Sequence, residues 1–431
     1  MNHHDFVNEI TAMLRRAEPP ITADCCIYRV PYDIRRLNED VFTPKVVSIG
    51  PFHHHALPRL HNMEKYKLVY LKRFSERDGV NLDTLITSVE EAEPSVRRCY
   101  SETIDLSMEQ LVKVILVDSC FLFELFWRSF YDEWTDDDNV HLKPWLTTTM
   151  RLDLLLLENQ LPFFVLERLY NLAFASSMSN NSKHPSFLEL TFDYFVYYNR
   201  LDLNPRDVSN SICHFTDLIR TFHLQPSNRR PRKFYMPPFE ELPERQDSLL
   251  KHLHSASELL EAGLKFKVSS KKCLLDLQFE KGVLEMPCFE VYNRTEIFVR
   301  NVMALEQCHY PSGTYVTDYI FLLDFLINTH KDVDVLVQKG ILVNWLGDSD
   351  AVATMVNGLC TNLTQTNMNS NYRRLCDDLN AFYNDRWHRR KATLRHDYFR
   401  TPWMTASSIA AILLLFLTLV QTICSIISLL K

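Results

Sequence analysis

Apolar residues recur at helical spacing through most of the chain. The pattern predicts helices at 60–77, 107–131 and 144–170, and again at 248–266, 296–308, 317–328, 332–339, 350–363 and 372–399. A short amphipathic helix is expected within residues 1–20. Pro162 is expected to kink or divide the 144–170 helix near Gln160, because proline removes a backbone donor.

In a few places apolar and polar residues alternate, with the two-residue period of a β-strand. Leu275, Leu277 and Phe279 alternate with polar residues, Lys281-Gly282 offers a turn, and apolar alternation resumes up to Val291. Two short extended pieces are also expected within 27–49. The fold class predicted is therefore mainly α (α+β), a large helix-rich body with a small β-hairpin component.

Residues 401–430 contain no charged side chain. As a helix, residues 405–430 would extend roughly 39 Å, enough to cross a hydrocarbon core of ~30 Å with some tilt. We therefore expect a single C-terminal transmembrane helix at 401–431. The residues expected to form this anchor are Trp403, Ile409, Leu413, Leu414, Leu415, Phe416, Leu417, Leu419 and Val420.

Basic residues gather on one side of this apolar segment. Only Lys431 follows it, which predicts a cytosolic body and a C-terminal end across the membrane. The polar N-terminus has no apolar core typical of a signal peptide. We expect the plasma membrane rather than an endomembrane. The membrane-proximal basic residues are Arg386, Arg389, Arg390, Lys391, Arg395 and Arg400.

Three segments follow from these patterns. Residues 1–26 form an N-terminal helix and lead-in, 27–400 form the body, and 401–431 form the anchor. Within the body, helical halves at 27–224 and 246–400 are joined by the linker 225–245, which has five prolines and a basic cluster. We expect the two halves to pack into one assembly.

Composition excludes several classes of function. The formal net charge is −7 despite the basic membrane-proximal segment, so the body is acidic and nucleic acid is not expected as a partner. With only 8 glycines and no phosphate-binding glycine motif, no nucleotide cofactor is expected. The 11 cysteines show no regular spacing and suit a reducing compartment. Asn180, Asn293 and Asn362 begin glycosylation sequons, which do not decide the topology.

Few residues suggest catalytic chemistry. His53-His54-His55 offers at most half of a zinc site, and a structural role in the loop is favoured. Glu158 and Asp118 lie in apolar surroundings, where a buried carboxylate can act as a general acid or simply join helices by hydrogen bonds. For both, and for the neighbours Asn159 and Gln160, we favour the structural role.

The cysteines offer no clear nucleophile. Cys120 and Cys308 are candidates, but Cys308 and His309 are adjacent on a helix and point apart. No cofactor, metal or catalytic residue is therefore predicted.

Several segments, in order, resemble one family. IYRVP, VSIGPFHHH, MEKYKLVYLKRF, LVDSCFLFELFW, LLLLENQLPFFVLE, SASELLEAGLKFK, RNVMALEQC and FRTPWMTASSIAA are similar to the plant family called domain of unknown function 247, also UPF0481. His55 departs from the family, which usually has glycine there. The resemblance implies a plant-specific protein with a C-terminal membrane helix and no established catalytic activity. Some grass members are implicated as pollen-side determinants of self-incompatibility.

Two functions follow from these observations. The first is a non-enzymatic, tail-anchored membrane protein acting in protein–protein recognition or signalling, with a self-incompatibility role as its narrower form. The alternative is an uncharacterised enzyme acting at a membrane surface. Recognition is expected in the irregular segments 131–140, 180–185 and 225–238, because loops on a rigid scaffold tolerate change. The partner-binding candidates are Trp134, Arg229, Arg230 and Tyr235.

The protein partner is not identified by the sequence. Polar residues of the apolar segment, such as Thr418 and Gln421, leave oligomerisation through the span open.

Overall fold

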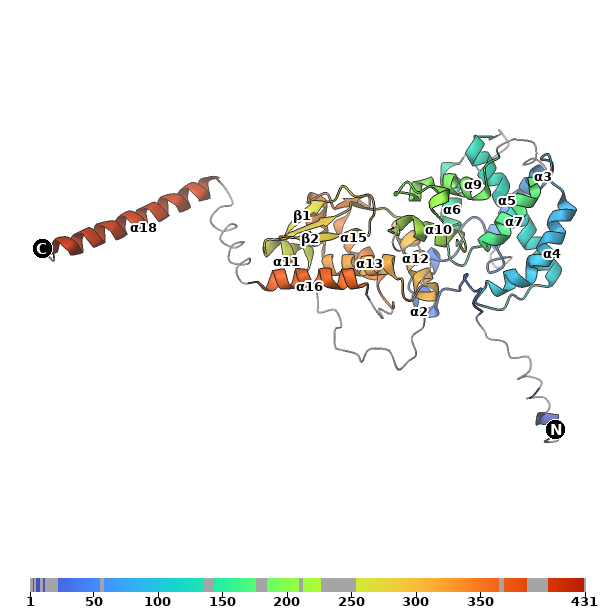
Figure 1. Ribbon diagram of the computed structural model, residues 1–431, viewed down its shortest axis with the longest axis horizontal. Helices are drawn as coiled ribbons and strands as arrows, with labels where there is room; N and C mark the ends of the chain where they lie inside the picture. The colour runs from blue at the N-terminus through green and yellow to red at the C-terminus, as the bar shows by residue number, and fades with distance from the viewer. Residues whose placement is uncertain are drawn as a thin grey trace. The chain divides into compact units, whose positions relative to one another are not determined.

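The structure, a computed structural model, is dominated by helices, as the sequence predicts (Figure 1). It describes residues 22–54, 58–134, 143–175, 184–208, 212–225, 253–363, 368–385 and 402–429, together with residues 3, 5–7 and 11. The predicted N-terminal helix and the linker 225–245 lie almost entirely outside the described residues.

The chain forms two compact units that are not continuous in sequence. Unit 1 contains residues 1–235, 292–319 and 359–367, and unit 2 contains the remainder. One boundary, after residue 235, lies within the linker, and another falls within helix α13 (Tyr315–Leu326). The elements of unit 1 are α2 (Tyr32–Arg35), η1 (Glu39–Val41), η2 (Pro58–Leu60), α3 (His61–Ser75), α4 (Leu82–Arg98), α5 (Met108–Tyr131), α6 (Pro144–Asp153), α7 (Phe163–Ala173), α9 (Phe187–Tyr194), η3 (Val196–Tyr198), η4 (Pro205–Asp207), α10 (Phe215–His223) and α12 (Thr295–His309).

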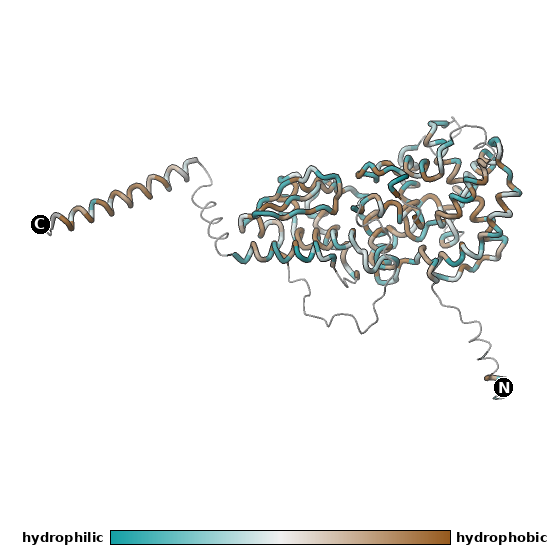
Figure 2. The backbone as a smooth tube through the Cα atoms, in the orientation of Figure 1, coloured by the Kyte–Doolittle hydropathy of each residue, from teal (hydrophilic) through white to brown (hydrophobic). Residues whose placement is uncertain are grey.

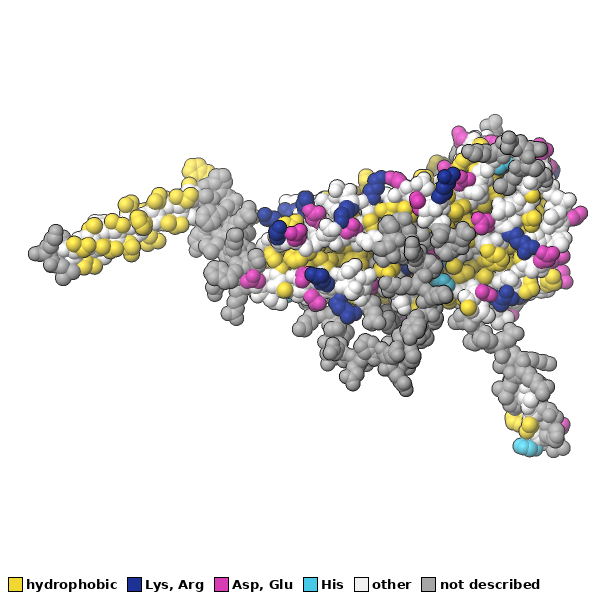
Figure 3. Space-filling view, in the orientation of Figure 1, with side chains coloured by type: hydrophobic (Ala, Val, Ile, Leu, Met, Phe, Trp, Pro, Cys, Tyr) yellow, Lys and Arg dark blue, Asp and Glu magenta, His cyan; other side chains and the backbone are white. Residues whose placement is uncertain are grey.

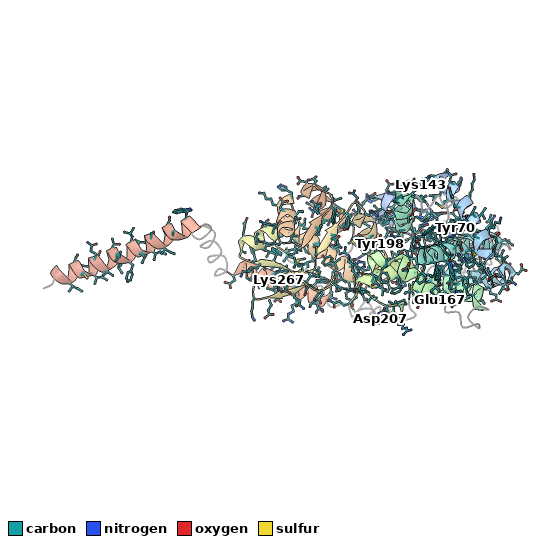
Figure 4. The ribbon with its side chains drawn as sticks, turned by 90° about the horizontal axis from the view of Figure 1, so that it is seen from above. Tyr70, Lys143, Glu167, Tyr198, Asp207 and Lys267 are labelled. Atoms are coloured by element: carbon teal, nitrogen blue, oxygen red, sulfur yellow. The ribbon has the colours of Figure 1, made fainter. Side chains whose placement is uncertain are left out.

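Helix α5 is the central helix of unit 1. Ser107 and Gln110 form a capping box at its first turn, and most of its residues are buried. Helices α3, α4, α7 and α9 pack against it. Its Phe126 ring stacks on Tyr194 with centroids 4.4 Å apart, and its Phe121 ring lies 5.3 Å from that of Tyr70, which is fully buried (Figure 4). Helix α5 confirms the helix predicted at 107–131, and its burial on nearly all sides makes it the core helix of unit 1.

The predicted helix 144–170 is divided, and over a longer stretch than expected. Helix α6 ends at Asp153, residues 154–162 are non-helical, and α7 starts directly after Pro162. The side-chain amide of Gln160 donates to the carbonyls of Leu154 and Leu156, both at 2.8 Å. Within residues 154–162, side chains therefore make the hydrogen bonds to backbone carbonyls that backbone N–H groups would make in a continuous helix.

Unit 2 contains two small sheets. Strand β3 (Val283–Met286) pairs in parallel with β1 (Lys265–Val268) and antiparallel with β2 (Gln278–Glu280), and β4 (Phe289–Val291) pairs in parallel with β5 (Leu342–Asn344). The hairpin β2–β3 confirms the predicted turn at Lys281-Gly282. The predicted helix 248–266 is shorter, since its end is strand β1. The helices of unit 2 are α11 (Ala256–Glu261), α14 (His330–Gln338), α15 (Ser349–Leu359), α16 (Ser370–Asn384) and α18 (Pro402–Leu429), with α15 ending at the boundary between the units.

The extended pieces predicted within 27–49 do not form a strand pair. Ile27 makes an isolated parallel bridge with Tyr100, and Val46–Ile49 has no strand partner. The apolar alternation there reflects burial of Val47 and Ile49, which does not require a sheet.

Helix α18 is apolar along nearly its whole length (Figure 2). Its stretch Ala406–Ile427 has a mean hydropathy of 2.5, and hydrophobic side chains cover its visible surface (Figure 3). Trp403 is 85% exposed. Within the described part of the chain, this is the one helix long and apolar enough to cross a membrane.

Candidate functional site

The segment 46–54 of unit 1 is held by side chains of buried polar residues. Asp153 accepts hydrogen bonds from the backbone N–H groups of Val46 at 2.6 Å and Val47 at 2.9 Å. Asn159 accepts from Ile49 N at 2.7 Å and donates to the Val47 carbonyl at 3.0 Å. These side chains take the place of a neighbouring strand, which explains why no sheet forms here.

Glu158, the first candidate acid, is completely engaged. Its Oε1 lies 2.6 Å from Arg35 Nη1 and accepts from Val30 N at 2.9 Å, and its Oε2 accepts from Arg29 Nη1 at 3.0 Å. His53 Nε2 lies 3.4 Å from Oε2. Burial opposes ionisation, but His53, Arg35 and the Val30 N–H together lower the pKa of Glu158 to about 2. A carboxylate held ionised in this way does not release a proton near neutral pH.

Asp118, the second candidate, joins three parts of unit 1. Lys67 Nζ lies 2.7 Å from its Oδ1, and Gly50 N donates to its Oδ2 at 2.8 Å. Burial raises the pKa of Asp118 to about 6, against the opposing effect of Lys67. The Asp118 carboxylate thus connects α5 with α3 and with the 46–54 segment. This is the structural role that we favoured from the sequence.

The backbone at Gly50 passes close to the backbone of Gln160. The φ of Gly50 is +74°, and an added Cβ would lie 2.3 Å from the Gln160 carbonyl oxygen. Tyr100 Oη donates to the same carbonyl at 2.8 Å. The segment therefore packs directly on the interruption between α6 and α7, and only glycine fits.

The cysteine and histidine candidates do not form a catalytic pair. Burial raises the pKa of Cys120 and of Cys308 to about 12. His309 Nδ1 lies 3.1 Å from the Tyr28 hydroxyl. His53 is buried beside Glu158, and burial lowers its pKa. His55 lies outside the described residues, which contain no group of three or more His, Cys, Asp or Glu placed to hold a metal ion.

A solvent-accessible pocket of about 530 Å³ is present in unit 1. It lies between α6, the loop after η1 and the start of α12. Its lining residues are Asp40, Thr43, Lys45, Pro144, Trp145, Thr148, Thr149, Leu152, Asp153, Leu156, Asn293, Arg294 and Ile297.

The chemistry of this pocket suits binding. Trp145 is 63% exposed, and Lys45 and Arg294 form no ion pair with any residue that the structure describes. The carboxylate of Asp153 is taken up by three backbone N–H groups, including Lys45 N at 2.9 Å. An exposed indole and two exposed cations can contact a ligand or partner, whereas the buried acid beside them already accepts three backbone hydrogen bonds.

Sequence reasoning did not find this pocket. Lys45, Trp145 and Arg294 are far apart in the chain and belong to no motif, so only the fold brings them together. Of the predicted partner-binding residues, Trp134 is half-buried against the core of unit 1. Arg229, Arg230 and Tyr235, and the basic residues at 386–400, lie outside the described residues.

The fold and this site define a helix-rich protein with an apolar C-terminal helix and a ligand-sized pocket in its larger unit. The family described as a plant protein of unknown function (DUF247) matches residues 27–417, and the chain belongs to this family. It is 28% identical to UPF0481 protein At3g47200 of Arabidopsis thaliana, covering 94% of this chain and 87% of that protein. It is 26% identical to putative UPF0481 protein At3g02645 of the same plant, covering 92% of this chain and 89% of that protein. No solved structure matches the chain.

Proposed function

We propose that this chain is a non-enzymatic recognition protein tethered to a membrane by α18, and that the pocket at Trp145 contributes to partner binding. One observation carries the proposal. The carboxylates that the sequence offered for catalysis, Glu158 and Asp118, are bonded to fixed cations and backbone N–H groups. The Lys45, Trp145 and Arg294 side chains of the pocket, in contrast, are exposed to solvent.

The charges of the pocket favour a partner with acidic groups. Lys45 and Arg294 are exposed cations beside the exposed Trp145 ring, and Asp40 is the exposed acid of the lining. Arginine and tryptophan are common among the residues that dominate binding energy at interfaces. The segments 131–140, 180–185 and 225–238 are further candidates for specificity.

The proposed topology places the body in the cytosol at the plasma membrane. The support is the excess of Lys and Arg before the apolar helix over the single Lys431 after it. Membership of a plant family allows a narrower form of the proposal, in which the recognised partner belongs to a pollen self-incompatibility system.

Partner binding is tested with the full-length, membrane-inserted protein. Trp145→Ala and the double variant Lys45→Glu/Arg294→Glu are compared with the wild type by quantitative co-purification from the native tissue. Matched controls are Tyr32→Ala, an exposed aromatic residue outside the pocket, and Lys113→Glu/Arg206→Glu, exposed cations outside the pocket. Proteins lost with both pocket variants and retained with both controls would support the proposal. Identical partner profiles in folded variants would refute it for this pocket.

Topology is tested separately with sealed vesicles. Protease added to the cytosolic face should digest the body and leave a protected fragment containing α18. Complete protection of the body, with glycans on Asn293 or Asn362, would show the opposite orientation.

A further inference from the structure

One face of α6 runs from the mouth of the pocket at Trp145 to its floor. Four residues of this helix line the pocket, at spacings of three and four that put them on one face: Trp145, Thr148, Thr149 and Leu152. The helix rises about 10 Å from the first of them to the last. Trp145 is 63% exposed, the two threonines are half-buried, and Leu152 is buried. The pocket is therefore open at Trp145 and closed at Leu152.

The floor of the pocket is apolar. Leu152 and Leu156 are 8% and 2% exposed, and Ile297 of α12 packs against the core of unit 1. Asp153 is the buried acid of the lining, and its carboxylate accepts three backbone N–H groups. Burial raises the pKa of Asp153 to about 6, so this group is mainly ionised at pH 7 and disfavours a second carboxylate beside it. The floor therefore suits the apolar end of a ligand.

The rim of the pocket has the opposite character. Lys45, in the loop after η1, and Arg294, the residue before α12, are both exposed, and Asp40 is the exposed acid of the lining. Two cations against one carboxylate leave the rim positive, which attracts an anionic group. Hydrogen bonds from lysine or arginine to a carboxylate are stronger than those between neutral groups. The acidic end of a ligand is therefore favoured at the rim.

The wall between floor and rim offers a flat ring and one hydroxyl. The exposed indole of Trp145 provides an apolar face on which a planar group can stack. Thr149 Oγ1 donates to the Trp145 carbonyl at 2.8 Å, whereas the Thr148 hydroxyl forms no hydrogen bond with any residue that the structure describes. The wall can thus hold a planar apolar group and make one further hydrogen bond to it.

We propose that this pocket binds a small amphipathic organic acid, with its flat apolar part on the wall and floor and its carboxylate held at the rim by Lys45 and Arg294. The volume of about 530 Å³ falls within the range of small-molecule pockets, about 300–1,000 Å³. A small ligand reaches the floor, whereas a flat protein surface would meet only the rim. The proposal rests on the proposed function in using the same pocket, and it adds a means of control, because a bound acid covers Trp145 and neutralises the rim.

The experiment is isothermal titration calorimetry of the full chain in detergent micelles with two probes of the same shape. Naphthalene-2-carboxylate carries the acid, and naphthalene-2-carboxamide is its neutral counterpart. The wild type should bind the carboxylate roughly tenfold more tightly than the amide. Lys45→Gln/Arg294→Gln should remove this preference with little effect on the amide, and the control Lys113→Gln/Arg206→Gln should keep it. Because all proteins are compared in the same micelles, partition of the probes into detergent cancels.

A second variant tests the position of the apolar part. Thr148→Phe fills the middle of the pocket and should weaken both probes by about tenfold or more, whereas Thr87→Phe, on the exposed surface of α4, should weaken neither. Thermal melting followed by circular dichroism checks that each variant is folded.

Four results would overturn the proposal: no binding of either probe to the wild type, equal affinity for acid and amide, a preference that survives Lys45→Gln/Arg294→Gln, or binding that Thr148→Phe leaves unchanged. These titrations contain no protein partner. They can therefore fail while co-purification of a partner still depends on Trp145, and the reverse outcome is equally recognisable.

Discussion

The ammonium group of Lys67 lies 2.7 Å from Oδ1 of Asp118, and both side chains are buried. Lys67 Nζ also donates to the Ser48 carbonyl at 2.5 Å and lies 2.7 Å from Glu64 Oε1. One cation thus connects α3, α5 and the 46–54 segment. Since its charge is compensated only by these contacts, the pair is sensitive to loss of either member.

Removing this cation should strongly destabilise the protein. Lys67→Met leaves Asp118 buried without its counter-charge, and we expect a loss of about 3–5 kcal/mol in the free energy of unfolding. The matched control Lys113→Met replaces an exposed lysine of α5 and should change stability by less than about 0.5 kcal/mol. Urea denaturation measures both. The double variant Lys67→Met/Asp118→Asn should recover part of the loss, and no recovery would contradict this account of the pair.

Glu158 and Glu102 provide a matched comparison, because both contact Arg29. Glu158 Oε2 lies 3.0 Å from Arg29 Nη1 in the interior, whereas Glu102 Oε2 lies 3.2 Å from Arg29 Nε at the surface. Glu158→Gln should cost about 3–5 kcal/mol, since two arginines lose their buried counter-ion. Glu102→Gln should cost less than about 1 kcal/mol. Equal effects in denaturant titrations would show that burial of Glu158 is not the deciding factor.

Gly50 and Gly347 separate steric conflict from backbone strain. Both have a φ in the left-handed region, +74° and +80°, but only at Gly50 would a Cβ meet backbone, 2.3 Å from the Gln160 carbonyl oxygen. Gly347→Ala should cost about 1–2 kcal/mol from strain alone. Gly50→Ala should cost clearly more, by about 2 kcal/mol or above, because backbone must also move. Thermal melts of the two variants compare these costs, and a milder effect at Gly50 would refute the predicted contact.

His223 should make stability depend on pH. Burial lowers its pKa from 6.5 to about 4. Between these values the unfolded chain binds more protons at this site than the folded protein, so its contribution is present above pH 6.5 and is lost as the pH falls through 4. His223→Asn keeps a side-chain N–H for the Ile219 carbonyl, which His223 Nδ1 meets at 2.8 Å, but cannot titrate.

The stability of the wild type relative to His223→Asn should therefore fall by up to about 3 kcal/mol from pH 7 to pH 4. Urea titrations at a series of pH values measure this difference. A difference that does not change with pH would show that His223 titrates normally in the folded protein.

A charge within α18 should abolish membrane association. Leu415→Arg places an arginine in the middle of the apolar stretch Ala406–Ile427, at a cost of about 2.5–3.5 kcal/mol for insertion. The control Leu415→Ile keeps the stretch apolar. We expect a shift of the protein from carbonate-washed membranes to the soluble fraction only with arginine. Equal retention of both variants would show that another part of the chain holds the protein at the membrane.

Sequence patterns predicted the helices whose apolar residues occupy one face or the whole helix surface. The spacing around α5 and the uninterrupted apolar run of α18 are of this kind. The segment at Val46–Ile49 was predicted to be a strand because its apolar residues look the same in sequence whether a strand or the side chains of Asp153 and Asn159 satisfy the backbone. No local pattern encodes contacts over a hundred residues apart.

The candidate site was predictable only in part. The structural roles of Glu158 and Asp118 followed from single polar residues within apolar runs, which need partners when buried. Their actual partners, Arg35 and Lys67, are specified by the tertiary fold. The pocket at Trp145 had no sequence signal, since exposed tryptophans and lysines are not distinguished by periodicity.

Asn301 of α12 donates to the Val41 carbonyl at 2.8 Å and accepts from Leu157 N at 2.9 Å. During synthesis on the ribosome, the nascent N-terminal region must therefore wait until α12 emerges, after four strands of unit 2 have already been made. Domains generally complete folding as units during translation, beginning at the N-terminus. In this chain that order is interrupted, so chaperones have an extended interval in which to bind the incomplete N-terminal region.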